Sequence, residues 1–232
     1  VEGKISFDGL VKVTGQMGMG KSFFVKQMFV MNSILKTKLL YFDPKAEVRK
    51  QFMKVLHDYE SQGIYPEICD YIKQINFVTI DARNSENHGV LDPLVFLTGQ
   101  EAKNLIISMI GEFYDLKQNE QFEKELLQMI EKYLVLRENG EKVGTKNIME
   151  ALTKSDTDRV RITAELLLEK MSNSTLSLCF SNGQNEAISM SKRISIIEVT
   201  GLELPTSETS ITENQRQSLV ALYALGQFCY KF

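Results

Sequence analysis

The sequence has few of the residues that usually build metal or nucleophile sites. Its three cysteines, Cys69, Cys179 and Cys229, are far apart, and there is no Cys-x-x-Cys pair or Cys/His cluster. This argues against a zinc site, and we interpret the three as small buried residues in a reducing compartment. The two histidines, His57 and His88, do not stand beside a serine or cysteine as a nucleophile pair would. We predict surface or loop positions for both.

Long apolar runs and blocks of a single charge are also absent. The uncharged stretch at residues 217–230 is too short and too polar to span a bilayer, and we find no signal peptide. Lys and Arg are interspersed with Asp and Glu, and the net charge is −3. This argues against binding of nucleic acid by this chain alone, because phosphate binding needs a concentrated basic surface. The chain begins at Val1 rather than Met, so we expect it to be cut from a longer protein.

What the sequence does contain is enough apolar material for a folded core. It has 232 residues, of which 43% are apolar and 25% charged, near the average for globular proteins. Over its first part, short β-like runs alternate with helix-like runs, which is typical of a parallel sheet with crossover helices. We predict strands at residues 10–14, 38–43 and 76–81, and helices at residues 20–35 and 47–60.

From about residue 98 to residue 172 the apolar period is helical throughout. Thr98-Gly99-Gln100-Glu101 fits a capping box. Apolar stripes then predict four helices, around residues 105–113, 122–133, 148–152 and 160–171. The β pattern returns with predicted strands at residues 176–180 and 194–199, and Thr212 caps a final helix. The sequence therefore predicts one α/β domain with an inserted helical block.

The most informative motif is a glycine-rich loop between the first predicted strand and helix. Gly15-Gln16-Met17-Gly18-Met19-Gly20-Lys21-Ser22 matches G-x-x-x-x-G-K-[ST] without a gap. Glycines let backbone N–H groups surround phosphates, and the following helix directs its positive end at the same anion. Lys21 can reach the β- and γ-phosphates, and the Ser22 hydroxyl can ligate Mg²⁺. The motif predicts a P-loop that binds a nucleoside triphosphate.

Hydrolysis requires further acidic groups. A P-loop ATPase holds Mg²⁺ with the help of an acidic residue on a neighbouring strand, and usually activates water with a carboxylate. Three predicted strands end in acid, at Asp43, Asp81 and Glu198, but none shows an apolar run followed by Asp-Glu. Each is either a site residue or an ordinary polar strand end. The second carboxylate is missing or lies outside this chain.

Four runs along the chain resemble one family of P-loop motors. They are residues 18–26 of the glycine loop and helix, Phe42-Asp43-Pro44-Lys45-Ala46-Glu47, residues 89–94 with Leu91-Asp92-Pro93-Leu94, and residues 199–205. Together they resemble the motor ATPases of bacterial conjugation and type IV secretion within the FtsK/HerA superfamily. The likeness is greatest to the VirB-system and TraC/TraE-like ATPases of mobile elements in Gram-positive bacteria, and it covers most of the chain. The glycine loop is common to many families, whereas the Asp-Pro-Lys-x-Glu and Leu-Asp-Pro-Leu runs narrow the choice.

The resemblance implies a RecA-like P-loop NTPase core with a mostly parallel sheet and an inserted all-helical subdomain. The first part of the core would be residues 1–95, the helical insertion residues 96–174, and the second part of the core residues 175–232. In this family, the loop residues that bind nucleotide correspond to Gly15, Gly18, Gly20, Lys21 and Ser22. We assign cofactor contacts to the whole stretch, which adds Gln16, Met17, Met19 and Phe23.

Further roles follow from the same resemblance. Lys21 would be a catalytic residue and Ser22 the Mg²⁺ ligand. The Asp-Pro-Lys-x-Glu run corresponds to Asp43, Lys45 and Glu47. Glu47 either approaches the γ-phosphate or the attacking water, as a second catalytic residue, or is a solvated charge in the first turn of a helix.

One departure from the family concerns the end of the chain. The acidic Walker B strand of the family follows the helix that here finishes at Phe232, so we expect a truncated C-terminal ATPase domain that binds ATP and Mg²⁺ better than it hydrolyses ATP. The resemblance implies ATP and ADP as ligands, other subunits of a secretion or conjugation channel as partners, and a homo-hexamer for the intact protein. It implies a cytoplasmic location, peripheral at the inner face of the cell membrane. Direct contact with nucleic acid stays open.

Two classes of function fit these observations. The first is a motor ATPase that energises conjugative DNA transfer or type IV secretion, with a DNA-translocating HerA/FtsK-type ATPase as its sister. The second is a P-loop domain that binds nucleotide as a structural or regulatory switch without turnover, which the missing acidic pair supports. We predict the first. A small-molecule kinase fits less well, because the helical block is too long and too regular for an ordinary lid.

Overall fold

The computed structural model describes residues 18–43, 46–172, 174–189, 192–205 and 210–231. Within these ranges the elements are α1 (Lys21–Asn32), β1 (Leu39–Asp43), α2 (Val48–Gln62), α3 (Pro66–Gln74), β2 (Asn76–Asp81), η1 (Ser85–Asn87), α4 (Pro93–Phe96), α5 (Gly99–Gly111), η2 (Leu116–Gln118), α6 (Glu120–Glu138), α7 (Thr145–Leu152), α8 (Asp158–Ser172), η3 (Thr175–Leu178), β3 (Ile194–Thr200) and α9 (Glu213–Tyr230), where η marks a 3-10 helix. The predicted strand at residues 10–14 lies outside the described residues.

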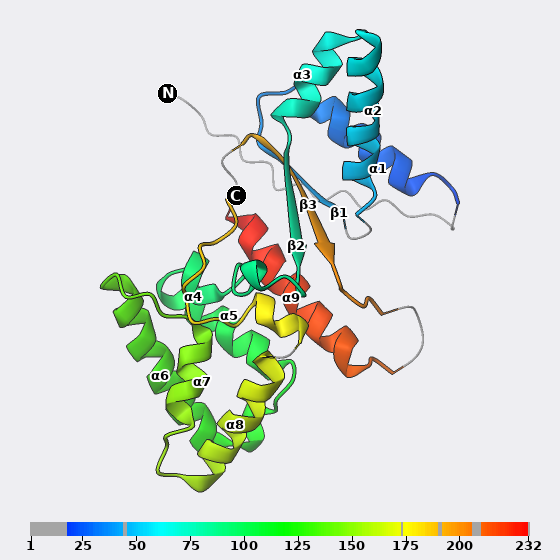
Figure 1. Ribbon diagram of the computed structural model, residues 1–232. Coiled ribbons are helices and arrows are strands. Elements are labelled where there is room, and N and C mark those ends of the chain that lie inside the picture. The colour runs from blue at the N-terminus through cyan, green and yellow to red at the C-terminus, as the bar shows by residue number, and fades with distance from the viewer. Residues whose placement is uncertain (1–17, 44–45, 173, 190–191, 206–209, 232) are drawn as a thin grey trace, which may run out of the picture.

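The described strands form a parallel sheet in the order β1-β3-β2 (Figure 1). The central strand is the last of the three in the sequence, so the chain returns to the middle of the sheet after the helical block. Asp43 of β1 and Thr79 of β2 both pair with Glu198 of β3. The carboxyl ends of the three strands therefore lie together at one end of the sheet, which we call its carboxyl edge. This mixed α/β arrangement with a parallel sheet confirms the predicted fold class.

The central strand β3 separates two apolar cores. Because side chains alternate between the faces of a strand, Ile194 and Ile196 point to one face and Ile197 and Val199 to the other. The first pair joins a small core with Phe29 of α1, and the second pair joins a much larger core. Six of the seven residues of β3 are buried, which is expected for a parallel strand covered on both faces.

The larger core connects the sheet to the helices that follow β2. Its largest fully buried side chains come from β2, the helices and the segment that leads into them: Ile80, Leu91, Leu94, Ile106, Met109, Ile110, Phe122, Leu126, Ile130, Ile148 and Met149. Helix α9 joins this core, and the rings of Phe228 and Phe96 meet edge to face with centroids 5.4 Å apart. Figure 1 shows α4–α8 as a helical lobe on the side toward which the strand arrows point, with α9 beside both lobe and sheet.

Most of the predicted elements are confirmed, and one strand is wrong. Residues 176–180 do not form a strand. Thr175–Leu178 is instead a 3-10 helix, started by a hydrogen bond from Leu176 N–H to the Ser174 hydroxyl. Leu176 and Leu178 are fully buried within the larger core. A short apolar run without a clear period can be buried in either conformation, so its pattern alone did not decide. Helix α3 was not predicted.

Of the two helix caps predicted from the sequence, one is confirmed and one is wrong. Thr212 and Gln215 form the reciprocal capping box of α9, with bonds of 3.2 Å and 3.0 Å. Thr98 is the N-cap residue of α5, but its side chain makes no capping bond. The first residue of this helix, Gly99, has a φ of +52°, which departs from the helical first turn that a capping box requires.

A buried carboxylate ties the start of the helical lobe together. Asp92 has no exposed surface. Its Oδ2 accepts hydrogen bonds from the Thr145 and Ser181 backbone N–H groups and the Ser181 hydroxyl, each at 2.9 Å. Its Oδ1 accepts from Leu94 N–H and the Thr145 hydroxyl. Burial raises the pKa of this carboxyl, and the bonds from Thr145 and Ser181 oppose the rise. One side chain thus joins three segments that are distant in sequence.

Close backbone packing around this carboxylate leaves room for glycine only. A Cβ on Gly144 would lie 2.2 Å from the Ser181 carbonyl oxygen and 2.7 Å from Asp92 Oδ2. Such contacts are shorter than real Cβ contacts, so the chain around residue 144 would have to move. The Leu-Asp-Pro-Leu run therefore has a structural role at the joint between sheet and lobe.

We expect the substitution Asp92→Ala to lower the free energy of unfolding by about 3–5 kcal/mol, because it leaves several buried donors without an acceptor. Chemical denaturation followed by circular dichroism measures this loss. The matched control is Asp115→Ala, which removes an exposed carboxylate that accepts one bond, from Lys117 N–H, and should cost no more than about 1 kcal/mol. Equal small losses for the two variants would contradict the assignment.

Candidate nucleotide-binding site

The second half of the predicted phosphate-binding loop lies among the described residues. Gly18 and Gly20 have φ angles of +83° and +75°, in the left-handed region that favours glycine. A Cβ at either position would meet no atom within 4 Å. Backbone conformation, not crowding, is therefore the reason for glycine here. Gly15, Gln16 and Met17 lie outside the described residues.

Helix α1 starts directly after this turn. Gly20 is its N-cap and Lys21 its first residue, and its first turn carries no acidic side chain. Ser22 and Phe23 are exposed. A helix N-terminus has N–H groups and a positive dipole end that suit an anion. The geometry at Gly20–Ser22 fits the phosphate-binding role that the motif predicts.

The other end of α1 fixes the direction of this helix over the sheet. The Arg193 guanidinium, just before β3, donates to the carbonyl oxygens of Ser33, Leu35 and Thr37, at 2.9, 2.6 and 3.1 Å. The C-terminal end of α1 therefore lies at the edge where β3 begins. Figure 1 shows α1 running obliquely from there, with its first residues on the side toward which the strands point. The first residues of α1 thus lie on the carboxyl side of the sheet, the side on which open α/β sheets bind ligands.

Three acidic residues meet at this edge of the sheet. Asp43 and Glu198 are register partners, and Asp81 pairs with Thr200 on the other side of β3. By alternation all three carboxylates belong to the face that packs α1 and α2, since Ile80 and Ile197 belong to the opposite core. The sequence singled out the three acids separately, and the fold brings them together.

The Asp43 carboxylate is hydrogen-bonded to the start of α2. It is buried, and its Oδ2 accepts a hydrogen bond of 2.6 Å from Val48 N–H. Glu47, the N-cap residue of that helix, is exposed. No contact distinguishes the two interpretations of Glu47, so its catalytic role stays a prediction. Lys45 lies outside the described residues.

The Glu198 carboxylate has one hydrogen-bonded oxygen and one oxygen without a hydrogen-bond partner among the described residues. The residue is 4% exposed. Its Oε2 accepts a bond of 3.1 Å from the Thr79 hydroxyl, which in turn accepts 2.8 Å from Arg49 Nη1. Its Oε1 is buried and has no hydrogen-bond partner among the described residues. A buried carboxylate oxygen of this kind is unusual in a native protein and calls for a ligand or water. In the sequence, only the acid near the strand end points to this arrangement.

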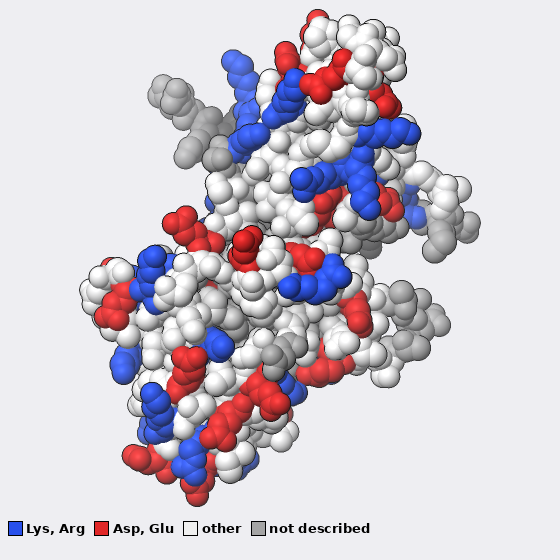
Figure 2. Space-filling model, in the orientation of Figure 1, with Lys and Arg blue, Asp and Glu red and all other residues white. Residues whose placement is uncertain are grey.

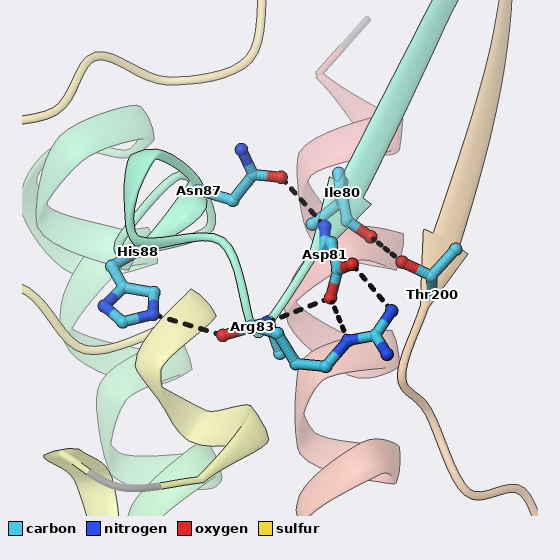
Figure 3. Close-up of polar contacts among 7 residues, drawn as sticks. Ile80, Asp81, Arg83, Asn87, His88 and Thr200 are labelled. Atoms are coloured by element: carbon cyan, nitrogen blue, oxygen red, sulfur yellow. Dashed lines mark hydrogen bonds and ion pairs between the residues drawn. The ribbon is translucent and has the colours of Figure 1, made fainter.

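The Asp81 carboxylate is hydrogen-bonded to the neighbouring Arg83 (Figure 3). The Arg83 guanidinium bonds Oδ1 at 2.9 Å and Oδ2 at 2.8 Å, and the Arg83 N–H adds a third bond. These bonds lower the pKa of Asp81 to about 2. The Asp81 N–H donates to Asn87 Oδ1, and Thr200 donates to the Ile80 carbonyl across the strands. Asp81 therefore closes the turn after β2.

The histidines take no part in this edge's acidic cluster. His57 is exposed on α2. His88 is half-buried in the loop after η1, with Nε2 3.1 Å from the Ala82 carbonyl oxygen (Figure 3). Both positions agree with the prediction of surface or loop residues.

The cysteines lie in apolar surroundings. Cys69 and Cys179 are buried and Cys229 is partly buried. Burial raises the pKa of the Cys229 thiol to about 11, and raises that of Cys179 further. Among the described residues, no three His, Cys, Asp or Glu side chains gather closely enough to hold a metal ion.

The visible surface carries mixed charge. Figure 2 shows Lys and Arg interspersed with Asp and Glu over the face drawn, without a continuous basic stripe. Within the described ranges, none of the helices has the length and apolarity that a bilayer crossing requires.

Comparison with known proteins agrees with the α/β fold class. The family model of the AAA-like domain matches residues 1–232. The chain is 34% identical over 223 residues to the uncharacterized protein YddE of Bacillus subtilis (strain 168). That alignment covers 95% of this chain and 27% of the relative, so the chain spans about a quarter of the length of the curated relative. No solved structure matches it. The chain belongs to the AAA-like domain family, within the broad class of P-loop ATPases.

Proposed function

We propose that this chain is the nucleotide-binding part of an ATP-hydrolysing motor that energises conjugative DNA transfer or type IV secretion. One observation carries the proposal: a complete G-x-x-x-x-G-K-S run precedes and opens α1, whose first residues lie on the carboxyl side of a parallel sheet, in an AAA-like domain. The runs around Asp43 and Asp92 that resemble such motors support the finer assignment.

Different residues of the loop would contact different parts of Mg-ATP. Backbone N–H groups from Gly15 to Phe23 would surround the phosphates, and the left-handed turns at Gly18 and Gly20 fit that path. Lys21 stabilises charge on the γ-phosphate, and the Ser22 hydroxyl ligates Mg²⁺. Mg²⁺, when bound, neutralises negative charge on the β- and γ-phosphates. Glu47, exposed at the start of α2, would approach the γ-phosphate or the attacking water.

The larger assembly belongs to the same proposal. The RecA-like core would comprise residues 1–95 and 175–232, with residues 96–174 as the helical insertion. The intact protein would act as a homo-hexamer, with other subunits of the channel as partners, ATP and ADP as ligands, and a cytoplasmic position at the inner face of the cell membrane. These assignments rest on the resemblance stated above.

The loop assignment is tested by Mg-ATP binding to the full-length protein, measured by calorimetry. We expect Lys21→Ala to weaken binding at least about 10-fold, because it removes a charge-assisted contact to the phosphates. The matched control is Lys26→Ala, further along the same helix, whose ammonium bonds Gln51 Oε1 at 3.1 Å. Equal affinity of the Lys21→Ala variant and the unmutated protein would remove the loop from the site.

Turnover is tested separately, by phosphate release from full-length protein with and without DNA. The proposed motor releases phosphate and assembles into a ring on size-exclusion chromatography with light scattering. Strong stimulation by DNA would favour the DNA-translocating sister function. Tight ATP binding with no phosphate release under any condition would contradict the motor and favour a nucleotide switch.

A further inference from the structure

Two consecutive basic residues just before β3, Lys192 and Arg193, bind the C-terminal ends of two different helices. The three bonds from the Arg193 guanidinium reach carbonyl oxygens at the end of α1. The Lys192 ammonium donates to the carbonyl oxygens of Lys73 and Ile75, at 3.2 Å and 3.4 Å, at the end of α3. The last carbonyl groups of a helix have no partner within the helix and attract cations. Each residue of the pair therefore caps one helix.

Arg193 makes its bonds from a rigid part of the sheet. Its own carbonyl oxygen accepts a hydrogen bond of 2.8 Å from Leu39 N–H, at the start of β1. The next residue, Ile194, is buried in the smaller core. A guanidinium is planar and holds its donors in a fixed fork, so three bonds to one turn of backbone define a single geometry. Arg193 thus joins the end of α1 to two neighbouring strands.

Few other described contacts orient α1. Phe29 is buried, and its ring meets Tyr41 of β1 edge to face, with centroids 5.3 Å apart. The bond from Lys26 to Gln51 lies at the exposed surface. Much of the remaining apolar surface of the helix is exposed. Within the described ranges, Phe29 and Arg193 are therefore the main contacts that set the direction of α1 over the sheet.

A small change of direction at the end of α1 is enlarged at its start. The helix has twelve residues and is about 18 Å long. A rotation of about 10° around the end held by Arg193 would move the start by about 3 Å. Binding groups must be held to within about 0.5 Å of their productive positions. Gly20–Ser22, the segment proposed to bind phosphate, lies at that start.

We propose that Arg193 is a positioning residue for the phosphate-binding loop and controls the affinity for nucleotide from the edge where β3 begins. This inference rests on the proposed nucleotide site. Arg193 acts through α1, because it fixes the direction in which the N–H groups at Gly20–Ser22 point. Lys192 makes the corresponding contact to α3, which carries none of the residues proposed for the site. Lys192 therefore has no such role, although it is the adjacent residue.

The first test measures Mg-ATP binding to the full-length protein by calorimetry. We expect Arg193→Ala to weaken binding about 10-fold, because the start of α1 is no longer held in one position. Arg193→Lys should lose less, since an ammonium keeps the charge and replaces part of the bonds. The matched control is Lys192→Ala, which removes a helix cap of the same kind and should leave the affinity unchanged.

The second test needs no nucleotide. Hydrogen–deuterium exchange of the ligand-free protein reports how firmly each helix is held. We expect the amides of α1 to exchange faster in the Arg193→Ala variant, with those of α3 unchanged. Lys192→Ala should give the reverse pattern.

The possible results separate the inference from the proposed function. Equal Mg-ATP affinity of the Arg193→Ala variant and the unmutated protein would overturn the inference, as would unchanged exchange of α1. Equal weakening by Lys192→Ala would overturn it too, since the effect would then be general destabilisation and not the direction of α1. If the unmutated protein itself does not bind Mg-ATP, the proposed function fails, and the control of nucleotide affinity by Arg193 fails with it.

Discussion

The central strand β3 is the constraint on which the rest of the structure depends. It pairs with β1 on one side and β2 on the other, and its side chains supply both cores of the molecule. A parallel strand in this position must be apolar on both faces, and Ile194, Ile196, Ile197 and Val199 meet that requirement. The buried exceptions are Ser195 and Glu198. The Glu198 carboxylate is held there by the hydrogen bond from the Thr79 hydroxyl.

The strand order brings the acidic residues of the candidate site together. Since β3 lies between strands that precede the helical lobe, residues more than a hundred positions apart become neighbours at one edge. Helix α1 is held by Arg193 at the opposite edge, so its first described residues lie on the carboxyl side of the sheet. Asp92 holds the lobe in place by joining the segment after β2 to α7 and to residue 181. Helix α1 and the helical lobe thus keep their positions through contacts of Arg193 and Asp92.

The sequence predicted the elements better than their arrangement. Strongly patterned runs, such as residues 76–81 and the Thr212 cap, form as expected because local pattern and tertiary packing agree. The run at residues 176–180 carries no period, and packing made it a 3-10 helix. The loop motif could be recognised directly from the sequence, because its glycines and Lys21 each have a defined role in phosphate binding. The unpaired oxygen of Glu198 could not be read, because it depends on which strands become neighbours and on how Thr79 is already bonded.

The most direct test of this account is a crystal structure of the full-length protein with Mg²⁺ and a non-hydrolysable ATP analogue. The account predicts the β- and γ-phosphates against the backbone at the start of α1, with the metal on the Ser22 hydroxyl. Phosphates bound away from α1 would contradict it.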